Sequence, residues 1–558
     1  MSHSRWNLLP RIPEKHWLNG SNMPRVIAQL LYNRGLTEPS QLEPFITADN
    51  RLSSSPFLLP DMYQAVARIY RALLSGERIA VYGDFDTDGI TATALVAQGL
   101  SILGCQVTPY IPHRLTEGYG LKTAALEKLY QQGTSLVITV DCGITALQEV
   151  TRARRLGLDI IITDHHTPPN IIPPATAVIN PKLPGSHYPF SDLAGVGVAF
   201  KLLQALLQNL GKEKHLDELM DLVALGTVAD MMPLLKENRY FVKQGLKRLN
   251  TSPRLGIREI MTQTELNIGN LTSECISWTI APRLNAAGRL DHAISSYELL
   301  MTESPHQAQE LTLWLEQKNT ERHNLTNQAL AKARDQILAE GISPLLLASD
   351  KDFPPGICGL VAGKLSEEFY RPAVAIRAGT QFSTGSCRSI PEFDIIHALS
   401  QCSHLFSYFG GHPQAAGFSI PTTNLPYLKQ TLLQLATAEL VGIDLRPKIN
   451  IDAEMKLKDL GGDTFPTIQK LAPFGQGNPA PTFLSQRVEV IDHRTIGGND
   501  EHLRLKLKQG RIIWDGIGFG LGRSKISPLL NIVFNIEIDR WGGEPRLRLN
   551  ILDFAPTS

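Results

Sequence analysis

Aspartate and histidine side chains follow several short apolar segments of the chain, each at the point where the segment ends. They are Asp84, Asp86 and Asp88 after Arg78–Gly83, Asp141 after Ser135–Val140, Asp164, His165 and His166 after Asp159–Thr163, and Asp230 after Leu222–Ala229. The carboxyl ends of parallel strands meet at one edge of a sheet, where such sheets bind their ligands. We therefore expect these side chains to converge on one site.

Carboxylate and imidazole groups gathered in this way predict a centre for divalent metal ions. Several negative charges repel one another unless cations neutralise them. Oxygen ligands with one or two imidazoles suit Mn²⁺ or Mg²⁺, and the lack of Cys-x-x-Cys pairs argues against structural zinc. Two such ions about 3.5–4 Å apart would clamp a phosphate group for in-line displacement.

Each of these residues alone has a simpler explanation. A single aspartate at a strand end is usually a helix cap, and a histidine pair is more often a surface or core feature. The alternating Asp84, Asp86 and Asp88 could form a solvated turn, or a calcium loop that lacks its distal glutamate. Only the joint placement of all the clusters at the same end of their strands favours a metal centre.

The segments that must position these residues predict a parallel α/β sheet. Apolar strands alternate with helix-length segments between about Ser55 and Asn180, which implies parallel pairing through right-handed crossovers. The expected strands are Arg78–Gly83, Gln106–Ile111, Ser135–Val140, Asp159–Thr163 and Ala177–Ile179. Helical segments follow to about Leu249, and the apolar stretch Leu193–Leu210, which Lys201 interrupts, is expected to be a buried helix.

The remainder of the chain predicts a long helix, a second α/β domain and a small barrel. Ser304 as N-cap, Pro305 in the first turn and Gly341 as the stop define a helix of roughly 50 Å. Short alternating strands at Arg487–Ile491, Leu503–Lys508, Ile532–Asp539 and Arg546–Ile551 suggest a small barrel. The expected domains are a loosely helical N-terminal extension (1–54), a catalytic α/β domain (55–270), a segment with an arginine motif and the long helix (271–341), a second α/β domain (342–445) and a barrel resembling an OB fold (446–558).

Composition limits the class of protein without revealing its partner. Of 558 residues, 43% are apolar, which excludes a disordered or fibrous chain. The 54 basic residues balance the 54 acidic ones, so any nucleic-acid surface must be a local patch. Residues 1–17 lack an apolar stretch of signal-peptide length, and the six cysteines include no Cys-x-x-Cys pair and show no zinc-site spacing, so we expect free thiols and a cytoplasmic location.

The acidic motifs, taken in order, resemble those of the DHH phosphoesterase superfamily and, more narrowly, its RecJ family of single-strand-specific 5′→3′ DNA exonucleases. The resemblance extends from about Leu52 to the C-terminus, with Thr87 where the family usually has alanine. It implies two divalent ions, Mn²⁺ or Mg²⁺, and catalytic roles for Asp141, His165 and His166. The implied ligands are Asp86, Asp88, Asp141 as the bridging carboxylate, His165 and Asp230, with Asp84, Asp164 and His166 as orienting groups or alternative ligands.

The same resemblance implies a path for nucleic acid along three further motifs. Its candidate contacts are Arg114 and Tyr119, then Arg283, Asn285 and Arg289, and in the second α/β domain Ser386, Arg388 and His412. Ser386 and Arg388 match positions implied to grip a terminal 5′ phosphate. Each motif alone could instead be structural: a glycine-containing loop with a half-buried tyrosine, a salt-bridged helix start, or an ordinary glycine-rich turn.

The C-terminal region adds a basic strand, because Arg504, Lys506 and Lys508 alternate with leucines. Such a strand fits single-strand binding by an OB fold, although solvated surface charge would look the same. The implied function is a single-strand-specific DNA exonuclease of repair and recombination that releases 5′ mononucleotides and works beside a single-strand-binding protein and a helicase. The alternatives are a DHH phosphodiesterase for small substrates or oligoribonucleotides, and a replication scaffold without activity.

Overall fold

The computed structural model describes residues 4–557 except 22, 115, 209 and 540–543. The chain divides into two compact units. One contains residues 54–232 and 241–445, and the other contains the residues up to Ser53, 233–240 and those from Arg446 onward. Each unit is described by itself below.

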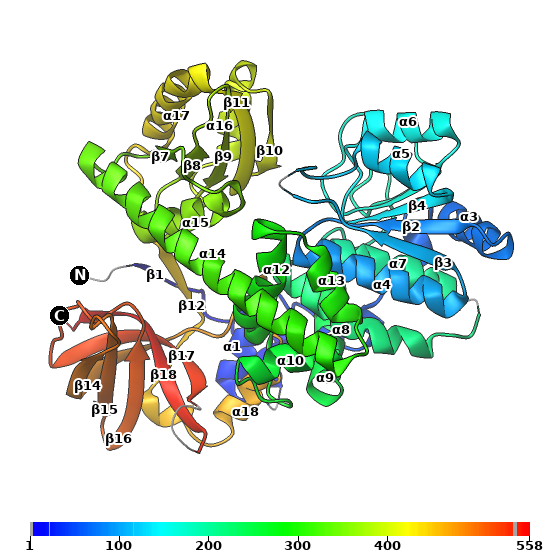
Figure 1. The fold of residues 1–558 in the computed structure, drawn as a ribbon. Helices are drawn as coiled ribbons and strands as arrows, with labels where there is room; N and C mark the ends of the chain where they lie inside the picture. Colours follow the sequence, from blue (N-terminus) through cyan, green and yellow to red (C-terminus); the bar gives the residue numbers. More distant parts are fainter. Residues whose placement is uncertain (1–3, 22, 115, 209, 540–543, 558) are drawn as a thin grey trace. The chain divides into compact units, whose positions relative to one another are not determined.

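A five-stranded parallel sheet forms the first part of the larger unit, as the alternation of strands and helices predicts (Figure 1). Its order is β3 (Gln106–Tyr110), β2 (Arg78–Tyr82), β4 (Thr134–Val140), β5 (Asp159–Thr163) and β6 (Ala177–Ile179). Tyr82 is level with Thr139, and Val140 is level with Thr163. The central strands therefore end at one edge, and the acidic residues that follow them start from the same level.

Helices cover both faces of this sheet. On one face lie α5 (Thr123–Gln131) and α6 (Leu147–Leu156), and on the other lie α4 (Thr87–Leu103) and α7 (Gly195–Gln208) (Figure 1). Helix α7 is buried along most of its length, including Lys201, as expected for an apolar helix inside a protein. Further helices between residues 54 and 304 include α3 (Met62–Leu74), α8 (Lys214–Ala229), α9 (Lys236–Thr251), α10 (Leu255–Gln263), α12 (Ala281–Leu290) and α13 (Ile294–Met301).

The long helix α14 (Pro305–Glu340) has the predicted ends. The Ser304 side chain accepts a hydrogen bond from the Gln307 N–H at 3.4 Å, Pro305 occupies the first turn, and Gly341 follows with a φ of 88°. Its 36 residues span roughly 54 Å at 1.5 Å per residue.

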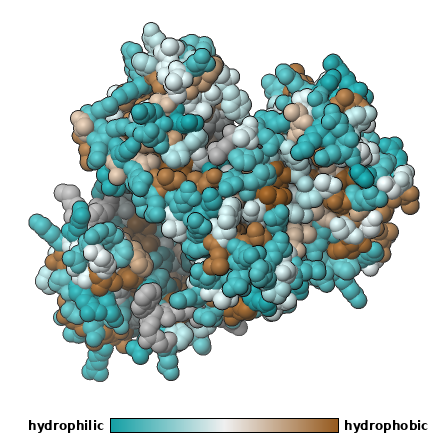
Figure 2. Space-filling view, in the orientation of Figure 1, coloured by the Kyte–Doolittle hydropathy of each residue, from teal (hydrophilic) through white to brown (hydrophobic). Residues whose placement is uncertain are grey.

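None of the described helices is both long enough and apolar enough to cross a membrane. The face shown in Figure 2 is mainly hydrophilic, with scattered hydrophobic patches.

The second α/β domain contains a mixed sheet in the order β10 (Tyr408–His412), β11 (Ala415–Pro421), β9 (Phe382–Arg388), β8 (Ala373–Arg377) and β7 (Leu346–Asp350). Only β7 and β8 are parallel within it. Helix α15 (Cys358–Phe369) and part of α14 pack on one face, where Ala373 and Ala375 lie. Helices α16 (Ile395–Gln401) and α17 (Leu425–Leu440) pack on the other face against Val374 and Ile376.

The smaller unit contains the expected barrel. Strands β14 (Phe483–Ile496), β15 (His502–Gln509), β16 (Ile512–Gly518), β18 (Arg546–Pro556) and β17 (Leu529–Asp539) pair in this order, and β14 closes on β17. Leu503, Leu505 and Leu507 point into the barrel, whereas Arg504 and Lys506 are exposed on the outside. Strand β16 was not predicted, because its sequence has no regular alternation and a tight turn at Gly510 joins it to β15.

The N-terminal segment, which we expected to be a loosely helical extension over residues 1–54, belongs to this unit. Strand β1 (Arg5–Leu8) pairs in parallel with β12 (Lys448–Ile451), and the Trp6 indole donates to Asp553 at 2.9 Å. Helix α1 (Arg25–Asn33) buries Leu30 and Leu31 in the same core as the barrel strands. An amphipathic helix needs such an apolar partner, and here the partner lies more than 400 residues along the chain.

We expect Leu30→Ala to destabilise the barrel, because it removes a fully buried side chain from the shared core. The loss should be roughly 2–5 kcal/mol of unfolding free energy. Hydrogen exchange of strands β15 and β18 measures it directly. The control is Leu74→Ala in α3, where the leucine is 87% exposed. Unchanged exchange in β15 and β18 would mean that the N-terminal segment does not support the barrel.

Candidate active site

The structure brings the predicted acidic residues together at the carboxyl edge of the first sheet. His165 Nε2 lies 3.1 Å from Asp141 Oδ1, 3.6 Å from Asp230 Oδ2 and 4.0 Å from Asp88 Oδ2. These residues come from the ends of β4, β5 and α8 and from the first turn of α4. The expected convergence is therefore present in the fold.

Asp141 occupies the most constrained position in the site. Its φ of 60° is left-handed, a conformation that costs free energy for a residue other than glycine. Its backbone N–H donates to Thr163 O at 3.0 Å, which holds it beside β5. Gly195 makes room for it, because a Cβ atom on Gly195 would lie 2.5 Å from the Asp141 side chain. The first residue of α7 thus has to be glycine.

Backbone amides at the start of α7 hold Asp88. Gly195 N and Val196 N donate to its two carboxylate oxygens at 2.7 and 2.9 Å. The partial positive charge of a helix N-terminus favours a carboxylate at this position. Neither Gly195 nor Val196 was predicted as a site residue. The available signal was the Gly195-Val196-Gly197 sequence at the start of an apolar helix.

Asp164 orients its neighbours through an extensive set of hydrogen bonds. Its Oδ1 accepts from the amides of His165 and His166 at 2.7 and 3.1 Å and lies 2.8 Å from His166 Nδ1. Its Oδ2 accepts from the Ile144 amide at 2.9 Å. Burial opposes its ionisation, but these bonds and the two histidines outweigh burial and lower the pKa of Asp164 to about 2. Both oxygens are engaged, so an orienting role suits Asp164 better than metal ligation.

The two histidines differ in protonation state near pH 7. Burial and the neighbouring His166 lower the pKa of His165 to about 3, so its imidazole is neutral near pH 7. Burial also acts against charge on His166, but its hydrogen bond to Asp164 and the surrounding carboxylates prevail and raise its pKa to about 9. A neutral imidazole can ligate a metal ion, whereas a protonated one can bind or protonate a phosphate oxygen.

Several buried polar atoms of the cluster have no hydrogen-bond partner within the described part of the chain. They are Asp84 Oδ1, Asp141 Oδ1, Asp230 Oδ2 and His165 Nδ1. Burial and neighbouring carboxylates raise the pKa values of Asp84, Asp141 and Asp230 well above the usual range, and that of Asp88 to about 7. Unpaired buried carboxylates are unfavourable unless cations or protons neutralise them.

The donor set fits divalent ions. Three groups of side chains offer ligand atoms within 4.8 Å of one another: Asp141, His165 and His166; Asp88, His165 and Asp230; and Asp84, Asp86 and Asp141. Asp141 belongs to two groups, as expected of a carboxylate that bridges two ions, and His165 also belongs to two, although its neutral imidazole would ligate one ion. Asp164 belongs to none of the three. Oxygen donors with one or two imidazoles match Mn²⁺ and Mg²⁺.

Aromatic and basic side chains surround His166. The His412 ring lies parallel to it with centroids 6.5 Å apart, and Tyr119, which is 43% exposed, lies 6.1 Å away edge-on. The Arg114 guanidinium stacks on Phe85 at 4.7 Å. Of the residues expected from the sequence, Tyr119 and His412 thus lie beside His166, and Arg114 is linked to Tyr119 through Phe85.

The arginine motif on α12 divides into structural and basic parts. Arg283 Nε pairs with Glu316 at 2.5 Å, which matches the alternative of a salt-bridged helix, and Asn285 Oδ1 accepts from the Thr87 amide at 2.8 Å. Arg289 is half-buried and donates to Gly356 O at 3.1 Å. Burial together with Arg114, Arg322 and Arg388 lowers the pKa of Arg289 to about 9. These four guanidinium groups form a basic cluster suited to an anion.

Ser386 and Arg388 lie on the same face of β9. The Arg388 side chain follows the surface of α15, where a Cβ atom on Gly359 would lie 3.2 Å from its Nη2. Its Nη1 donates to the carbonyl of Cys387 at 2.8 Å, so its other nitrogens remain available for a ligand. Glycines in α15 thus allow Arg388 to reach the basic cluster.

Three family models match the chain in sequence: the DHH family N-terminal domain over residues 78–227, the DHHA1 domain over 336–438 and the RecJ OB domain over 451–553. The single-stranded-DNA-specific exonuclease RecJ of Bacillus subtilis is 37% identical over 95% of this chain and 68% of its own length. The chain belongs to the RecJ family. RecJ of Haemophilus influenzae is 33% identical, covering 89% of this chain and 90% of its own.

Solved RecJ structures have the same fold. The crystal structure of Thermus thermophilus RecJ in complex with Mn²⁺ matches 99% of this chain and 80% of its own, with a TM-score of 0.86 and 29% identity. A second crystal structure of the same protein is in complex with Mg²⁺ and has a TM-score of 0.80. The unpaired carboxylates of this chain thus occur in a fold that is known with both ions.

We expect Asp141→Asn to have opposite effects on the metal-free and metal-loaded protein. Without metal, the amide relieves repulsion among buried carboxylates, so the midpoint of thermal unfolding in EDTA should rise. Affinity for Mn²⁺ should fall by at least about tenfold, since a shared ligand is lost. Thermal unfolding in EDTA and calorimetric titration with Mn²⁺ measure the two effects. Asp335→Asn, on the exposed side of α14, is the control. Undiminished Mn²⁺ affinity in this variant would contradict the role of Asp141 as a metal ligand.

Proposed function

We propose that this chain is a single-stranded-DNA-specific exonuclease that depends on Mn²⁺ or Mg²⁺ and digests from the 5′ end, releasing 5′ mononucleotides in DNA repair and recombination. The observation that carries the proposal is the cluster of unpaired buried carboxylates at the sheet edge. It lies in a chain that also matches the RecJ OB domain. Relatives that are 37% and 33% identical over 95% and 89% of this chain are named single-stranded-DNA-specific exonucleases.

The residues of the site divide the work of hydrolysis. When bound, two divalent ions neutralise the carboxylates and activate water for in-line attack on the phosphodiester. Asp86, Asp88, Asp141, His165 and Asp230 hold them, with Asp84 as a further oxygen donor. Asp164 keeps His166 protonated and oriented, so that this imidazolium can bind the scissile phosphate or protonate the leaving oxygen.

The basic cluster supports 5′ polarity. Arg114, Arg289 and Arg388 are half-buried, and this burial tends to lower the pKa of each. Asp84 and Asp86 act on Arg114, and Asp86 acts on Arg289, but the gathered guanidinium groups still suit an anion such as a terminal phosphate. Ser386 contributes a hydroxyl from the same face of β9 as Arg388. A strand bound here by its 5′ phosphate would present its first phosphodiester for cleavage.

The other functions considered fit the structure less well. A phosphodiesterase for small substrates or oligoribonucleotides has no use for a closed barrel with a basic outer strand. An inactive scaffold would have no reason to keep a complete set of buried acids, which cost stability while unpaired. Both arguments favour the exonuclease.

The proposal extends to partners and to the compartment. A single-strand-specific enzyme needs unpaired DNA, so we place it beside a helicase and a single-strand-binding protein. The six cysteines are free thiols, and four of them are buried, which suits a reducing cytoplasm.

We expect Arg388→Ala to lose the preference for 5′-phosphorylated strands before it loses all hydrolysis. A charge-assisted contact to phosphate is worth about 1.5–3 kcal/mol, so KM for a 5′-phosphorylated strand should rise about tenfold or more. KM for a 5′-hydroxyl strand should change little. Steady-state hydrolysis of strands labelled at either end measures both values.

The control for Arg388→Ala is Arg334→Ala. It removes an arginine from the surface of α14 that pairs with Glu368 of α15. It should leave both KM values unchanged. If the wild type attacks both ends of a strand equally, the proposed polarity is wrong, whatever the variant does.

We expect the basic outer face of β15 to add affinity for long strands without sequence preference. Replacing Arg504 and Lys506 together by alanine should reduce the dependence of log affinity on log salt by about 1.4, or 0.7 for each lost phosphate contact. Cleavage of very short oligonucleotides should persist. Binding across a salt titration, with the exposed pair Arg523 and Lys525 replaced as control, measures this. Equal slopes in the two variants would exclude β15 as a DNA contact.

A further inference from the structure

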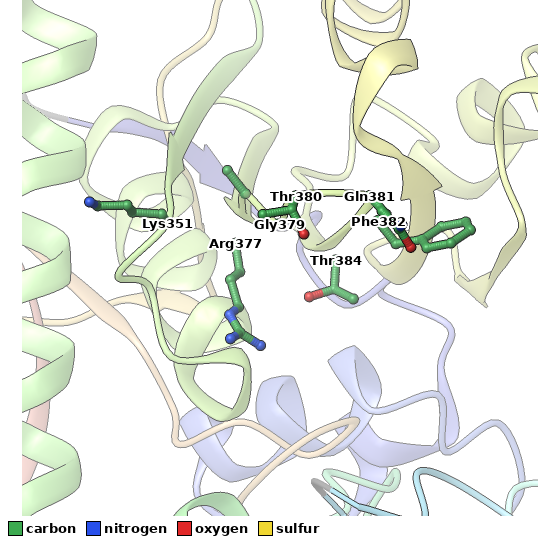
Figure 3. A pocket seen from close by; sticks show the side chains of 8 residues that line it. Lys351, Arg377, Gly379, Thr380, Gln381, Phe382 and Thr384 are labelled. Atoms are coloured by element: carbon green, nitrogen blue, oxygen red, sulfur yellow. The ribbon is translucent and has the colours of Figure 1, made fainter.

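A second basic hollow lies in the second α/β domain (Figure 3). Its volume is about 550 Å³, within the range of small-molecule sites. It is lined from the carboxyl ends of the parallel strands β7 and β8 and from the start of β9. Ligands of α/β sheets characteristically bind at such strand ends.

The charge of this hollow is positive. Lys351 follows β7 and Arg377 ends β8, and neither forms an ion pair within the described part of the chain. None of the described lining residues is acidic. The nearest carboxylate in the register, Asp350, is engaged elsewhere, 3.9 Å from Lys332 and accepting from the Asp352 amide at 2.7 Å. Arg377 is therefore the cation that the hollow offers to an anion, because the Lys351 side chain extends away from Arg377 (Figure 3).

Hydroxyl and aromatic groups complete the lining. Figure 3 shows Arg377 and Thr384 side by side below the 379–381 loop, with the Thr384 hydroxyl turned toward Arg377. Lys351 lies beyond Arg377, and Phe382 lies beyond Thr384 on the opposite side (Figure 3). Phe382 is 55% exposed. Cation, hydroxyl and aromatic ring thus follow one another along the hollow.

The loop that forms the wall is held in place by its own hydrogen bonds. Gly379 N donates to Ser383 Oγ at 3.1 Å, Thr422 Oγ1 donates to Gly379 O at 2.9 Å, and Thr422 N donates to Gln381 O at 2.9 Å. A Cβ atom on Gly379 would lie 1.9 Å from Phe382 O, so the tight turn requires glycine. The hollow is preformed, which limits the entropy lost when a ligand binds.

The hollow continues the face of β9 that carries the terminal-phosphate residues. Phe382, Thr384, Ser386 and Arg388 alternate along β9 and therefore share one face, with successive members about 7 Å apart. In register, Thr384 lies opposite Arg377, and Arg388 lies opposite Ala373. A second anion site thus adjoins the first along a single strand.

We propose that this hollow is a second nucleotide site, in which Arg377 and Thr384 bind a phosphate and Phe382 stacks on a base. The choice of a nucleotide rests on the proposed function. The nucleotide is either one unit of the DNA strand or a released mononucleotide, and both carry the same phosphate and base. Guanidinium and hydroxyl donors suit the phosphate, and base–aromatic stacking tolerates any sequence.

The test is calorimetric titration of the full chain with thymidine 5′-monophosphate in EDTA, where no hydrolysis occurs. The wild type should bind two molecules, one at Ser386 and Arg388 and one in the hollow. Arg377→Gln and Thr384→Val should each weaken one of the two sites by about tenfold. Arg388→Ala should weaken the other. Lys429→Gln, a charge-matched change on helix α17, is the control and should leave two sites.

Binding of a 20-nucleotide strand to the same variants identifies the source of the nucleotide. If Arg377→Gln weakens strand binding relative to Lys429→Gln, the hollow holds a unit of the strand. If only mononucleotide binding falls, the hollow holds the free nucleotide. Either result supports the site, provided that thermal unfolding shows the variant to be folded.

Unchanged mononucleotide stoichiometry and affinity in both Arg377→Gln and Thr384→Val would overturn the proposal. The proposal would also be overturned if the wild type bound a single molecule of thymidine 5′-monophosphate and the Arg388→Ala variant lost that binding. Hydrolysis of labelled single strands by the wild type with Mn²⁺ is measured separately. A failure of the exonuclease function is thus distinguishable from a failure of the second site.

Discussion

Repulsion among buried carboxylates is the constraint on which the first α/β domain depends. Asp84, Asp141 and Asp230 have pKa values raised well above the usual range, so the site opposes their ionisation. The surrounding backbone holds the acids in place despite this. The amides of Gly195 and Val196 fix Asp88, while three other amides fix Asp164. The free energy lost in the empty cluster is recovered when cations bind the folded state.

The same constraint explains the glycines and the unusual backbone around the site. Gly195 must lack a side chain because Asp141 occupies that space, and Gly226 must lack one because Thr91 and Asp88 approach within 2.4 and 2.7 Å of its Cβ position. Asp141 itself takes a left-handed conformation. Close packing of α4, α7 and α8 thus brings the acids of α4, α8 and the end of β4 within a few ångströms of one another.

The parts of this arrangement that the sequence predicts are those governed by local pattern. Alternating strands and helices fix a parallel sheet, and a parallel sheet fixes where Asp141 and His165 must lie. Backbone donors leave no such pattern, so the role of Val196 was not foreseeable. Nor was the partner of Arg283, because Glu316 lies on another helix and any nearby acid would have fitted the motif. Likewise, α1 gave a clear apolar face but no sign of what covers it.

The pairing of β1 with the distant strand β12 has a consequence for biosynthesis. Trp6 bonds to Asp553 and β1 pairs with β12, so the residues of β1 meet their partners only after more than 400 further residues have been translated. The larger unit can fold while synthesis continues, but the barrel must wait with α1 unsheltered. Contacts of such sequence separation form slowly. An exposed amphipathic helix during that interval is a natural target for chaperones that bind nascent chains.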